Sequence, residues 1–597
     1  MKRKRETYEY NTRSKKPHIQ VDYEQLDKIK EKQWVAATKT FNYIKNDHLV
    51  DWLKNFGSRE RSYSTDEIDF EETFSSFLSK KGIVFEKKIV DYLRHNNFPV
   101  KHISDHYNKE SAKLTVQSMK EGVPIIHSAP IYNPRNKTYG IIDLLVRSDY
   151  INRICQTDVI ENTDKRARHL SGNYHYLVID IKYHTLGLSS DGEHLLNSGN
   201  MASYKSQLCV YNSAIANVQG YNPQKAFILG RRWKYTRRGK KFQGFSCFDR
   251  LGVVDFLGYD KHVPSQTNNA LSWYRKVHKY GIRWGVDPPT IPELYPNMCV
   301  ESYAWNDYKK KLAWKLGEIS MLWNCGVKHR MKAFSHGVTS WRDPACCSEI
   351  LGIKKDSHRA RVVDQIIHIN RDENVPYILP TQITNNQQDW KQFDPQEIYI
   401  DFETFSDICQ NFDTLPQQPA MNMIFMIGVT YFKEGFWRYK SYIIKNISYE
   451  EENRIMKQFL NFYNSLNRPN VYFWHAEKNF WKRSCTQQLS HGFTIPQTDI
   501  KWFDMCAFFK QEPITIKGCF GFGLKNIVKS MKQHGMIHTP FESECQNGMM
   551  AMIKAWNCYR HSSHPDTSHI MKDIEEYNKF DCDSLKDIMV YLRTKYA

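Results

Sequence analysis

A strand-like stretch in this 597-residue chain carries two acidic residues. Its sequence is IYIDFETF, residues 398–405, whose isoleucine, tyrosine and phenylalanine residues predict a buried β-strand. Side chains two residues apart on a strand lie on the same face, so Asp401 and Glu403 share one side of an apolar element. Because neighbouring carboxylates repel each other, this pattern predicts that a cation lies between them.

The alternation of helical and strand-like patterns predicts an α/β protein with several domains. A chain of 597 residues is long enough for several domains of roughly 100–200 residues each. Strand patterns dominate two stretches, and helical patterns lie before and between them. We expect a basic disordered tail (1–34), a first α/β domain that begins with helices (35–265), a helical connector (266–380), a polar linker (381–396) and a second α/β domain with a mixed sheet (397–597).

Charge and composition narrow the classes of partner. The formal net charge is +19, which favours a polyanion such as nucleic acid. The 14 cysteines form no CxxC motif, which indicates free thiols in a reducing, intracellular compartment. We expect no membrane partner, because no apolar run reaches the length of roughly 20 residues that a membrane span needs. The basic N-terminus predicts a nuclear-localisation patch, a phosphate-contacting arm or a solvated tail.

A first acidic site is predicted by two further strand patterns. GIIDLLV (140–146) places Asp143 in an apolar strand, and VIDIKYHT (178–185) places Asp180 and Lys182 on one face of another strand. A metal ion held by Asp143 and Asp180 would remove their repulsion, polarise a phosphodiester and activate a water molecule. The ammonium of Lys182 would orient that water or neutralise developing charge.

The order of these motifs resembles that of a known nuclease family. Glu86 lies in an expected helix, the G-I-I-D and D-I-K strands follow, and a Q-x-x-x-Y helix places Gln207 and Tyr211 on one face. This order resembles the RecB-like nucleases of the PD-(D/E)XK superfamily. The resemblance implies a restriction-endonuclease-like α/β core, metal binding by the acidic residues including Glu86, catalysis by Lys182, and a DNA strand positioned by Gln207 and Tyr211.

One feature departs from several RecB-like relatives. These relatives carry an iron–sulfur cluster whose first cysteine precedes the nuclease motifs. In this chain the first cysteine is Cys155, which follows Asp143. We therefore expect no iron–sulfur cluster.

The segment RRWKYTRRGKK (231–241) predicts a basic hairpin with two aromatic residues and no acid. Such a hairpin beside a nuclease site suits contacts with nucleic-acid phosphates. An edge hairpin that is merely protected by its charge is the alternative. The residues expected to bind nucleic acid here are Arg231, Arg232, Lys234, Arg237 and Arg238.

A second family resemblance concerns the C-terminal third of the chain. EEYNKFDCDSL (575–585) places Tyr577 and Asp581 four residues apart on a helix, on one face. Together with the D-x-E strand, this Y-x-x-x-D helix resembles the DEDDy branch of DnaQ-like 3′–5′ exonucleases, which have an RNase H-like fold. The resemblance implies a third acidic residue from a middle motif, for which Glu477 is our candidate and Asp504 the alternative.

The chemistry implied for this second site uses divalent ions. Two Mg²⁺ or Mn²⁺ ions would be bridged by Asp401, since an all-carboxylate site suits these metals. Asp401, Glu403 and Asp581 would then be catalytic, with the Tyr577 hydroxyl assisting the attacking water. In the segment 516–535, the glycines Gly518, Gly521 and Gly523 precede an expected helix and would let a nucleic-acid backbone approach its start, with Lys525 assisting. A nucleotide-binding loop and a plain loop are the alternatives.

Both resemblances together predict a metal-dependent nuclease. The pair of domains resembles predicted RecB-family nucleases with an appended RNase H-like domain, which occur in prokaryotes and large DNA viruses. The connector segment 317–347 resembles a helix-hairpin-helix, and ordinary helical packing is its alternative. We expect a deoxyribonuclease in replication, repair or genome processing, acting in a nucleus or at a viral replication site. The alternatives are a nucleic-acid-binding protein with decayed sites and an RNA-directed nuclease.

Overall fold

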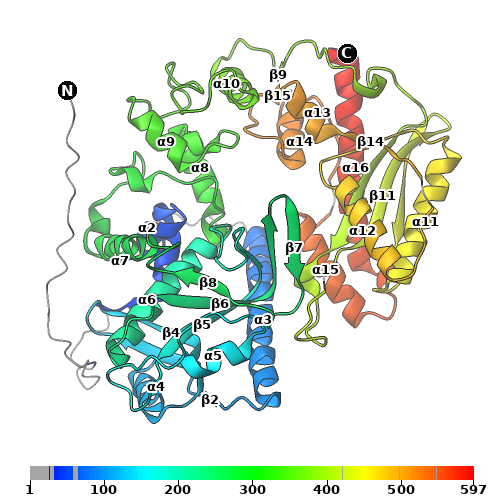
Figure 1. Ribbon diagram of the computed structural model, residues 1–597. Coiled ribbons are helices and arrows are strands. Elements are labelled where there is room, and N and C mark those ends of the chain that lie inside the picture. The colour runs from blue at the N-terminus through cyan, green and yellow to red at the C-terminus, as the bar shows by residue number, and fades with distance from the viewer. Residues whose placement is uncertain are drawn as a thin grey trace, which may run out of the picture. The chain divides into compact units, whose positions relative to one another are not determined.

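The computed structural model of the chain divides into two compact units (Figure 1). It describes residue 26 and residues 33–57, 65–419, 421–496, 498–541, 543–545 and 547–597. The first unit comprises Met1–Lys45, Gly82–Arg275 and Thr414–Gln418, and the second comprises Asn46–Lys81, Lys276–Asp413 and Pro419–Ala597. Apart from Leu26, Gln33 and Trp34, the tail expected at residues 1–34 lies outside the described residues.

A mixed eight-stranded sheet forms the centre of the first unit. Six strands run in the order β2-β3-β4-β5-β6-β7, while β1 pairs with β4 and β8 pairs with β6. The pairs β1–β4, β2–β3 and β5–β6 are parallel, and the remaining pairs are antiparallel. The strands are β1 (Val35–Ala36), β2 (Val100–His102), β3 (Ile125–Asn133), β4 (Thr138–Arg147), β5 (Tyr176–Gly187), β6 (Lys225–Arg237), β7 (Lys240–Gly244) and β8 (Gly252–Asp255).

Helices pack on this sheet. α4 contacts β3, and α6 contacts β3, β4 and β5. The limits of α4 follow from its sequence, because the Asn108 side chain accepts a hydrogen bond from Ser111 N and Gly122 ends the helix in the left-handed conformation. The helices are α1 (Phe41–Ile44), α4 (Lys109–Glu121), α5 (Ser148–Ile154) and α6 (Met201–Gln219), together with α3 (Thr65–His95) and α7 (Val263–Tyr280), within which unit boundaries fall.

The second unit contains a mixed five-stranded sheet in the order β12-β11-β10-β13-β14. The central strand β10 pairs antiparallel with β11 and parallel with β13. The apolar stretch at 421–432 therefore becomes a buried strand beside the acidic one. The strands are β10 (Ile398–Phe405), β11 (Met423–Lys433), β12 (Phe436–Ile443), β13 (Asn470–Phe473) and β14 (Lys501–Asp504).

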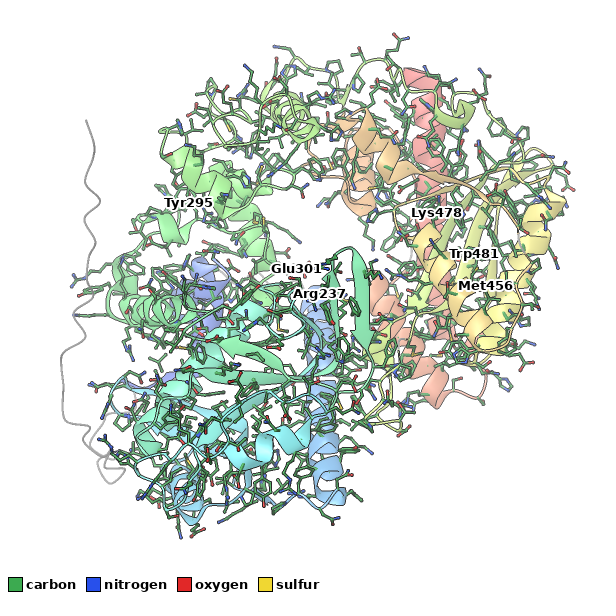
Figure 2. The ribbon with its side chains drawn as sticks, in the orientation of Figure 1. Arg237, Tyr295, Glu301, Met456, Lys478 and Trp481 are labelled. Carbon is green, nitrogen blue, oxygen red and sulfur yellow. The ribbon has the colours of Figure 1, made fainter. Side chains whose placement is uncertain are left out.

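Long amphipathic helices enclose this second sheet. The C-terminal helix α16 (His569–Tyr596), red in Figure 1, contacts β10 and β11. Met456 and Trp481, labelled in Figure 2, belong to one apolar core with the strands. The other helices here are α11 (Tyr449–Ser465), α12 (Glu477–Ser490), α13 (Met505–Gln511), α14 (Leu524–Gln533) and α15 (Gly548–His561).

The expected connector is helical, but it is part of the second unit. Its helices are α8 (Asn306–Leu316), α9 (Val327–Phe334) and α10 (His358–Arg371), and α2 (His48–Phe56) also belongs to this unit. β9 (Ile378–Leu379) pairs antiparallel with β15 (Thr515–Ile516), so the connector shares a small sheet with the C-terminal region. Between α8 and α9, in the segment that resembles a helix-hairpin-helix, lie residues 317–326, which include a short 3₁₀ helix at Ile319–Met321.

The expectation of a polar linker at residues 381–396 is wrong. Ile383 and Trp390 are fully buried and belong to the core that contains β13 and β14 residues. Arg593 Nε donates to the Trp390 carbonyl at 2.6 Å, and Trp390 Nε1 donates to the Asn385 carbonyl at 2.5 Å. One large aromatic side chain thus anchors a segment whose composition is otherwise polar.

The described part of the chain is α/β with several mixed sheets, as the sequence predicts. Among its described helices, none combines the length and the apolarity that crossing a bilayer requires. All fourteen cysteines lie in the described part and are free thiols.

Candidate active sites

The first acidic cluster lies where β4 and β5 meet. Asp143 Oδ2 accepts a hydrogen bond from the backbone N–H of Ile181 at 2.6 Å. Lys182 Nζ lies 2.7 Å from Asp180 Oδ2 and 3.8 Å from Asp143 Oδ2. The pairing between β5 and β6 changes register directly after Lys182, a bulge of the kind that directs a side chain. The structure therefore brings the three residues expected for the first site together.

The charged groups of this cluster are buried close together, which changes the pKa values of Asp143 and Lys182. Asp180 is fully buried, and among the described residues its Oδ1 atom has no hydrogen-bond partner. Burial raises the pKa of Asp143 well above its usual range, and the neighbouring Asp180 raises it further. Burial alone would lower the pKa of Lys182, but Asp180 and Asp143 outweigh burial and raise it. Lys182 is thus a permanent cation beside two acids.

Glu86 reaches this cluster from α3. After burial and Asp180, its charge also raises the pKa of Asp143, whereas Lys182 lowers that pKa. Its Oε1 atom lies 3.0 Å from His127 Nε2, and His127 Nδ1 lies 3.0 Å from His102 Nδ1. The sequence analysis did not identify His127. The only signal for it was a polar residue within the apolar strand that begins at Ile125.

Gln207 and Tyr211 meet on one face of α6, as their spacing predicts. Gln207 Nε2 donates to Tyr211 Oη at 2.7 Å. A Cβ atom on Gly140 would lie 2.3 Å from the Tyr211 ring, which explains the glycine in the G-I-I-D strand. Burial raises the pKa of Tyr211 and Asp180 adds to this rise, so the ring lies close to the acids. Both side chains are buried and face the cluster from within the protein.

The basic segment forms the β6–β7 hairpin, but its residues separate into two groups. Arg231 and Arg232, both expected to bind nucleic acid, are buried, at 8% and 6% exposed. Their strand lies inside the sheet: Arg231 packs 4.9 Å from the Tyr183 ring centroid, and Arg232 contacts Thr185. The exposed cations of the segment are Lys234, Arg237, Arg238, Lys240 and Lys241, and Figure 2 shows Arg237 in this hairpin.

The second cluster joins β10 to α16. Asn578 Nδ2 donates to Asp401 Oδ2 at 2.9 Å and lies 3.4 Å from Glu403 Oε1. Its Oδ1 accepts from the Tyr439 hydroxyl at 3.0 Å. Gly428 lies opposite Asp401 on β11, and a Cβ atom there would lie only 1.6 Å from Asn578 Oδ1. A glycine is thus required for the amide of Asn578 to reach both carboxylates.

Burial raises the pKa of three acidic residues in this cluster, and neighbouring acids add to the rise for Asp401 and Glu403. Burial raises the pKa of Glu403 to about 8, with Asp581 as the second cause. Burial raises the pKa of Asp581 to about 6, against the opposing charge of Lys525. Burial, Glu403 and Asp581 together raise the pKa of Asp401 well above its usual range. Asp581 Oδ1 is buried and, within the described part of the chain, accepts no hydrogen bond.

Tyr577 lies beside these carboxyls on α16. Burial and the nearby Asp581 raise the pKa of Tyr577, and its hydroxyl is hydrogen-bonded to Asp581. Lys525, the second residue of α14, lies with its Nζ 4.4 Å from the Tyr577 ring centroid. Lys525 therefore lies at the edge of the acidic cluster. The sequence had predicted only that Lys525 assists the glycines before this helix, and it did not predict that they lie beside the acids.

Of the two candidates for the third acidic residue, Glu477 and Asp504, only Glu477 faces the cluster. Glu477 is the first residue of α12 and is 5% exposed. Burial raises its pKa, and Asp401 is the next cause, so its carboxyl faces the cluster. Asp504 instead caps α13, because its Oδ1 accepts from Ala507 N at 2.9 Å. The backbone before Glu477 is unusual, since His475 has a left-handed φ of 78°.

The donors of both clusters suit a hard divalent cation. Buried carboxylate oxygens without hydrogen-bond partners, at Asp180 and Asp581, need a positive partner. Within the described residues no group of three acidic, histidine or cysteine side chains is arranged closely enough to coordinate a metal ion. Protein groups contact other carboxylate oxygens of the clusters: Lys182 lies against Asp180 Oδ2, and Asn578 donates to Asp401 Oδ2. The residues therefore fit a metal by charge and donor type.

Comparison with known proteins leaves the function to be inferred from this geometry. No model of a known protein family matches the chain, and no curated protein matches it.

Proposed function

We propose that the protein is a metal-dependent nuclease with two sites, a RecB-like site in the first unit and a DnaQ-like 3′–5′ exonuclease site in the second. The observation that carries the proposal is the convergence of Asp401 and Glu403 with Asp581 from a helix about 180 residues later in the sequence. A fold gains nothing from burying three mutually repelling carboxyls, so their approach favours a functional cation site.

At the second site, Asp401, Glu403, Glu477 and Asp581 would hold Mg²⁺ or Mn²⁺. Bound divalent ions would supply an activated water and stabilise the leaving 3′-oxygen. The raised pKa of Tyr577 keeps its hydroxyl neutral at neutral pH. Because its one proton is donated to Asp581, its oxygen would accept a hydrogen bond from the attacking water and orient it. The hydroxyl hydrogen-bonds to Asp581, which fixes where it points.

At the first site, Glu86, Asp143 and Asp180 would hold the metal ion. Lys182 keeps its proton because both aspartates raise its pKa, which excludes it as a general base. Its ammonium instead neutralises the charge that develops on the phosphate in the transition state. Tyr211 positions the strand of Asp143, because its ring packs against Gly140, and Gln207 holds the Tyr211 hydroxyl by a hydrogen bond.

The ligand that fits the net charge of +19 is DNA, with RNA as the alternative substrate. The fourteen free thiols suit a reducing, intracellular compartment. The role that follows is end trimming and strand cleavage in replication, repair or genome processing, in a nucleus or at a viral replication site.

The test is a cleavage assay on the full chain with Mg²⁺ or Mn²⁺. Substrates are single- and double-stranded DNA and RNA labelled at the 5′ or the 3′ end. Lys182→Ala and Asp401→Ala should each retain one activity, and the double variant should lose both. Asp180→Asn serves as a second first-site variant, because it removes an expected metal ligand while Lys182 keeps Asp143 as a charged neighbour at 3.8 Å.

Two outcomes overturn the proposal. If the wild-type chain cuts no substrate with either metal, the protein binds nucleic acid without hydrolysing it. If the double variant, purified in parallel, cuts as fast as wild type, the activity is a contaminant.

A further inference from the structure

The β6–β7 hairpin carries a row of aromatic rings on one face. Its two strands are joined by Arg238 and Gly239, both with positive φ, as a two-residue type I′ turn requires. The cross-strand pairs are Trp233 with Gly244, Tyr235 with Phe242 and Arg237 with Lys240. Because alternate residues of a strand share a face, these three pairs lie on the same side of the hairpin.

The rings on this face are stacked in order. The Arg250 guanidinium lies 4.2 Å from the Trp233 ring centroid, which covers the inner end of the row. Trp233 and Tyr235 stack at 5.8 Å with an interplanar angle of 22°, and Tyr235 and Phe242 stack at 4.9 Å with an angle of 12°. We call Arg250, Trp233, Tyr235 and Phe242 the aromatic ladder.

The ladder has one anchored end and one exposed end. Trp233 and Tyr235 are half-buried and pack against the apolar core of the first unit. Phe242 is 38% exposed. Because Phe242 stacks on Tyr235 and is still partly exposed, the outer end of the ladder presents an aromatic ring to solvent.

We propose that the exposed end of the aromatic ladder stacks on the unpaired bases of a single-stranded nucleic acid. The cations around the ladder favour a negatively charged partner. Arg237 and Lys240 lie on the ladder face, and Lys234 and Lys241 lie on the opposite face. Aromatic rings flanked by cations match a flexible polyanion with exposed base faces, whereas a duplex hides those faces. The choice of nucleic acid as the partner rests on the proposed function.

The position of the ladder relates it to the first site. Lys182 on β5 pairs with Gly230 on β6, and Tyr235 lies five residues farther along the same strand. At about 3.3 Å per residue, Trp233 lies roughly 10 Å and Tyr235 roughly 17 Å along β6 from the strand position of Lys182. The ladder and the first site therefore belong to neighbouring parts of the same sheet.

The test compares a strand with bases and a strand without them. Fluorescence anisotropy of the full chain in EDTA, which prevents cleavage, measures binding of a 20-nucleotide oligothymidylate and of an abasic sugar–phosphate strand of equal length and charge. The wild-type chain should bind oligothymidylate roughly ten-fold more tightly than the abasic strand, as expected for one or two stacked bases. Phe242→Ala should remove this difference, and Phe242→Tyr should retain it.

The control variant separates stacking from charge. Arg237→Gln should weaken binding of both strands equally and reduce the dependence on salt. Equal wild-type affinities for the two strands, or an equal loss for both in Phe242→Ala, overturn the inference while leaving the nuclease proposal standing. No binding of either strand at low salt overturns the inference together with the proposed nucleic-acid substrate. Circular dichroism of Phe242→Ala establishes that the variant is folded.

Discussion

Buried carboxylates repel one another in both acidic clusters, but different groups offset this repulsion in the two clusters. In the first unit, Lys182 supplies a positive charge within 4 Å of both aspartates. In the second unit the group that bridges the acids is Asn578, whose amide is neutral. Both clusters lie on strands whose pairing changes register directly after the last site residue, Lys182 or Glu403. The two clusters thus share a change of strand register after the last site residue. They differ in the group that contacts the carboxylates, which is an ammonium in the first cluster and a neutral amide in the second.

This difference predicts which cluster depends more on a cation. A built-in ammonium balances part of the negative charge of the first cluster before any ion binds. The second cluster has only Lys525 at its edge, and the pKa of Glu403 accordingly rises to about 8. The first cluster should therefore be stable without metal, whereas the second should gain stability when a divalent ion binds.

Breaking the built-in pair of the first cluster should have the largest effect on stability. Lys182→Met leaves buried Asp180 facing Asp143 without a cation, which should lower the free energy of unfolding by about 3–5 kcal/mol at pH 7. Urea unfolding in EDTA measures the loss, and Lys234→Met, at an exposed site, is the matched control. Adding Asp180→Asn should restore much of the stability. A loss below about 1 kcal/mol, as for an exposed ion pair, would contradict the built-in pairing.

Removing a charge from the second cluster should increase the free energy of unfolding instead of lowering it. Because the folded pKa of Glu403 is raised to about 8, its contribution to stability is complete near pH 4 and is lost as the pH rises through 8. Glu403→Gln should therefore increase the free energy of unfolding of the metal-free chain by roughly 2–3 kcal/mol at pH 8. Unfolding in EDTA at pH 5 and pH 8 tests this; an equal effect at both values would refute the repulsion.

The smallest effect concerns the third acidic position. Asp504→Ala removes a helix cap and should cost about 1 kcal/mol of stability, with 3′-end trimming retained. Glu477→Gln should leave the fold intact and reduce trimming by at least roughly 100-fold, because it removes a carboxylate that faces Asp401. Release of labelled 3′ nucleotides measures both variants. The opposite pattern would make Asp504 the third acid.

The spacing rules predicted the parts of the sites that depend on local structure. Asp180 with Lys182, and Gln207 with Tyr211, contact each other because residues two apart on a strand or four apart on a helix share a face. The convergence of Asp401 with Asp581 followed from family resemblance, since spacing alone does not reveal long-range contacts.

Other features could not be predicted in the same way. Asn578 is neutral and lies next to Tyr577 in the motif, so a search for charged ligands passed over it. Charge predicted that Arg231 and Arg232 bind nucleic acid, but it did not reveal that their strand lies inside a sheet that buries both. The linker assignment failed because Trp390 outweighs the polar residues around it.

The most direct test of the account is cation binding by the second cluster. Mn²⁺ is titrated into Asp143→Asn protein at pH 7 by calorimetry in two buffers of different ionisation enthalpy. We predict saturable binding with proton release, because the raised pKa values of Glu403 and Asp401 mean that the ion displaces protons. Adding Asp401→Asn should abolish both signals. Binding that is unchanged by Asp401→Asn, or no binding by the Asp143→Asn protein, would contradict the account.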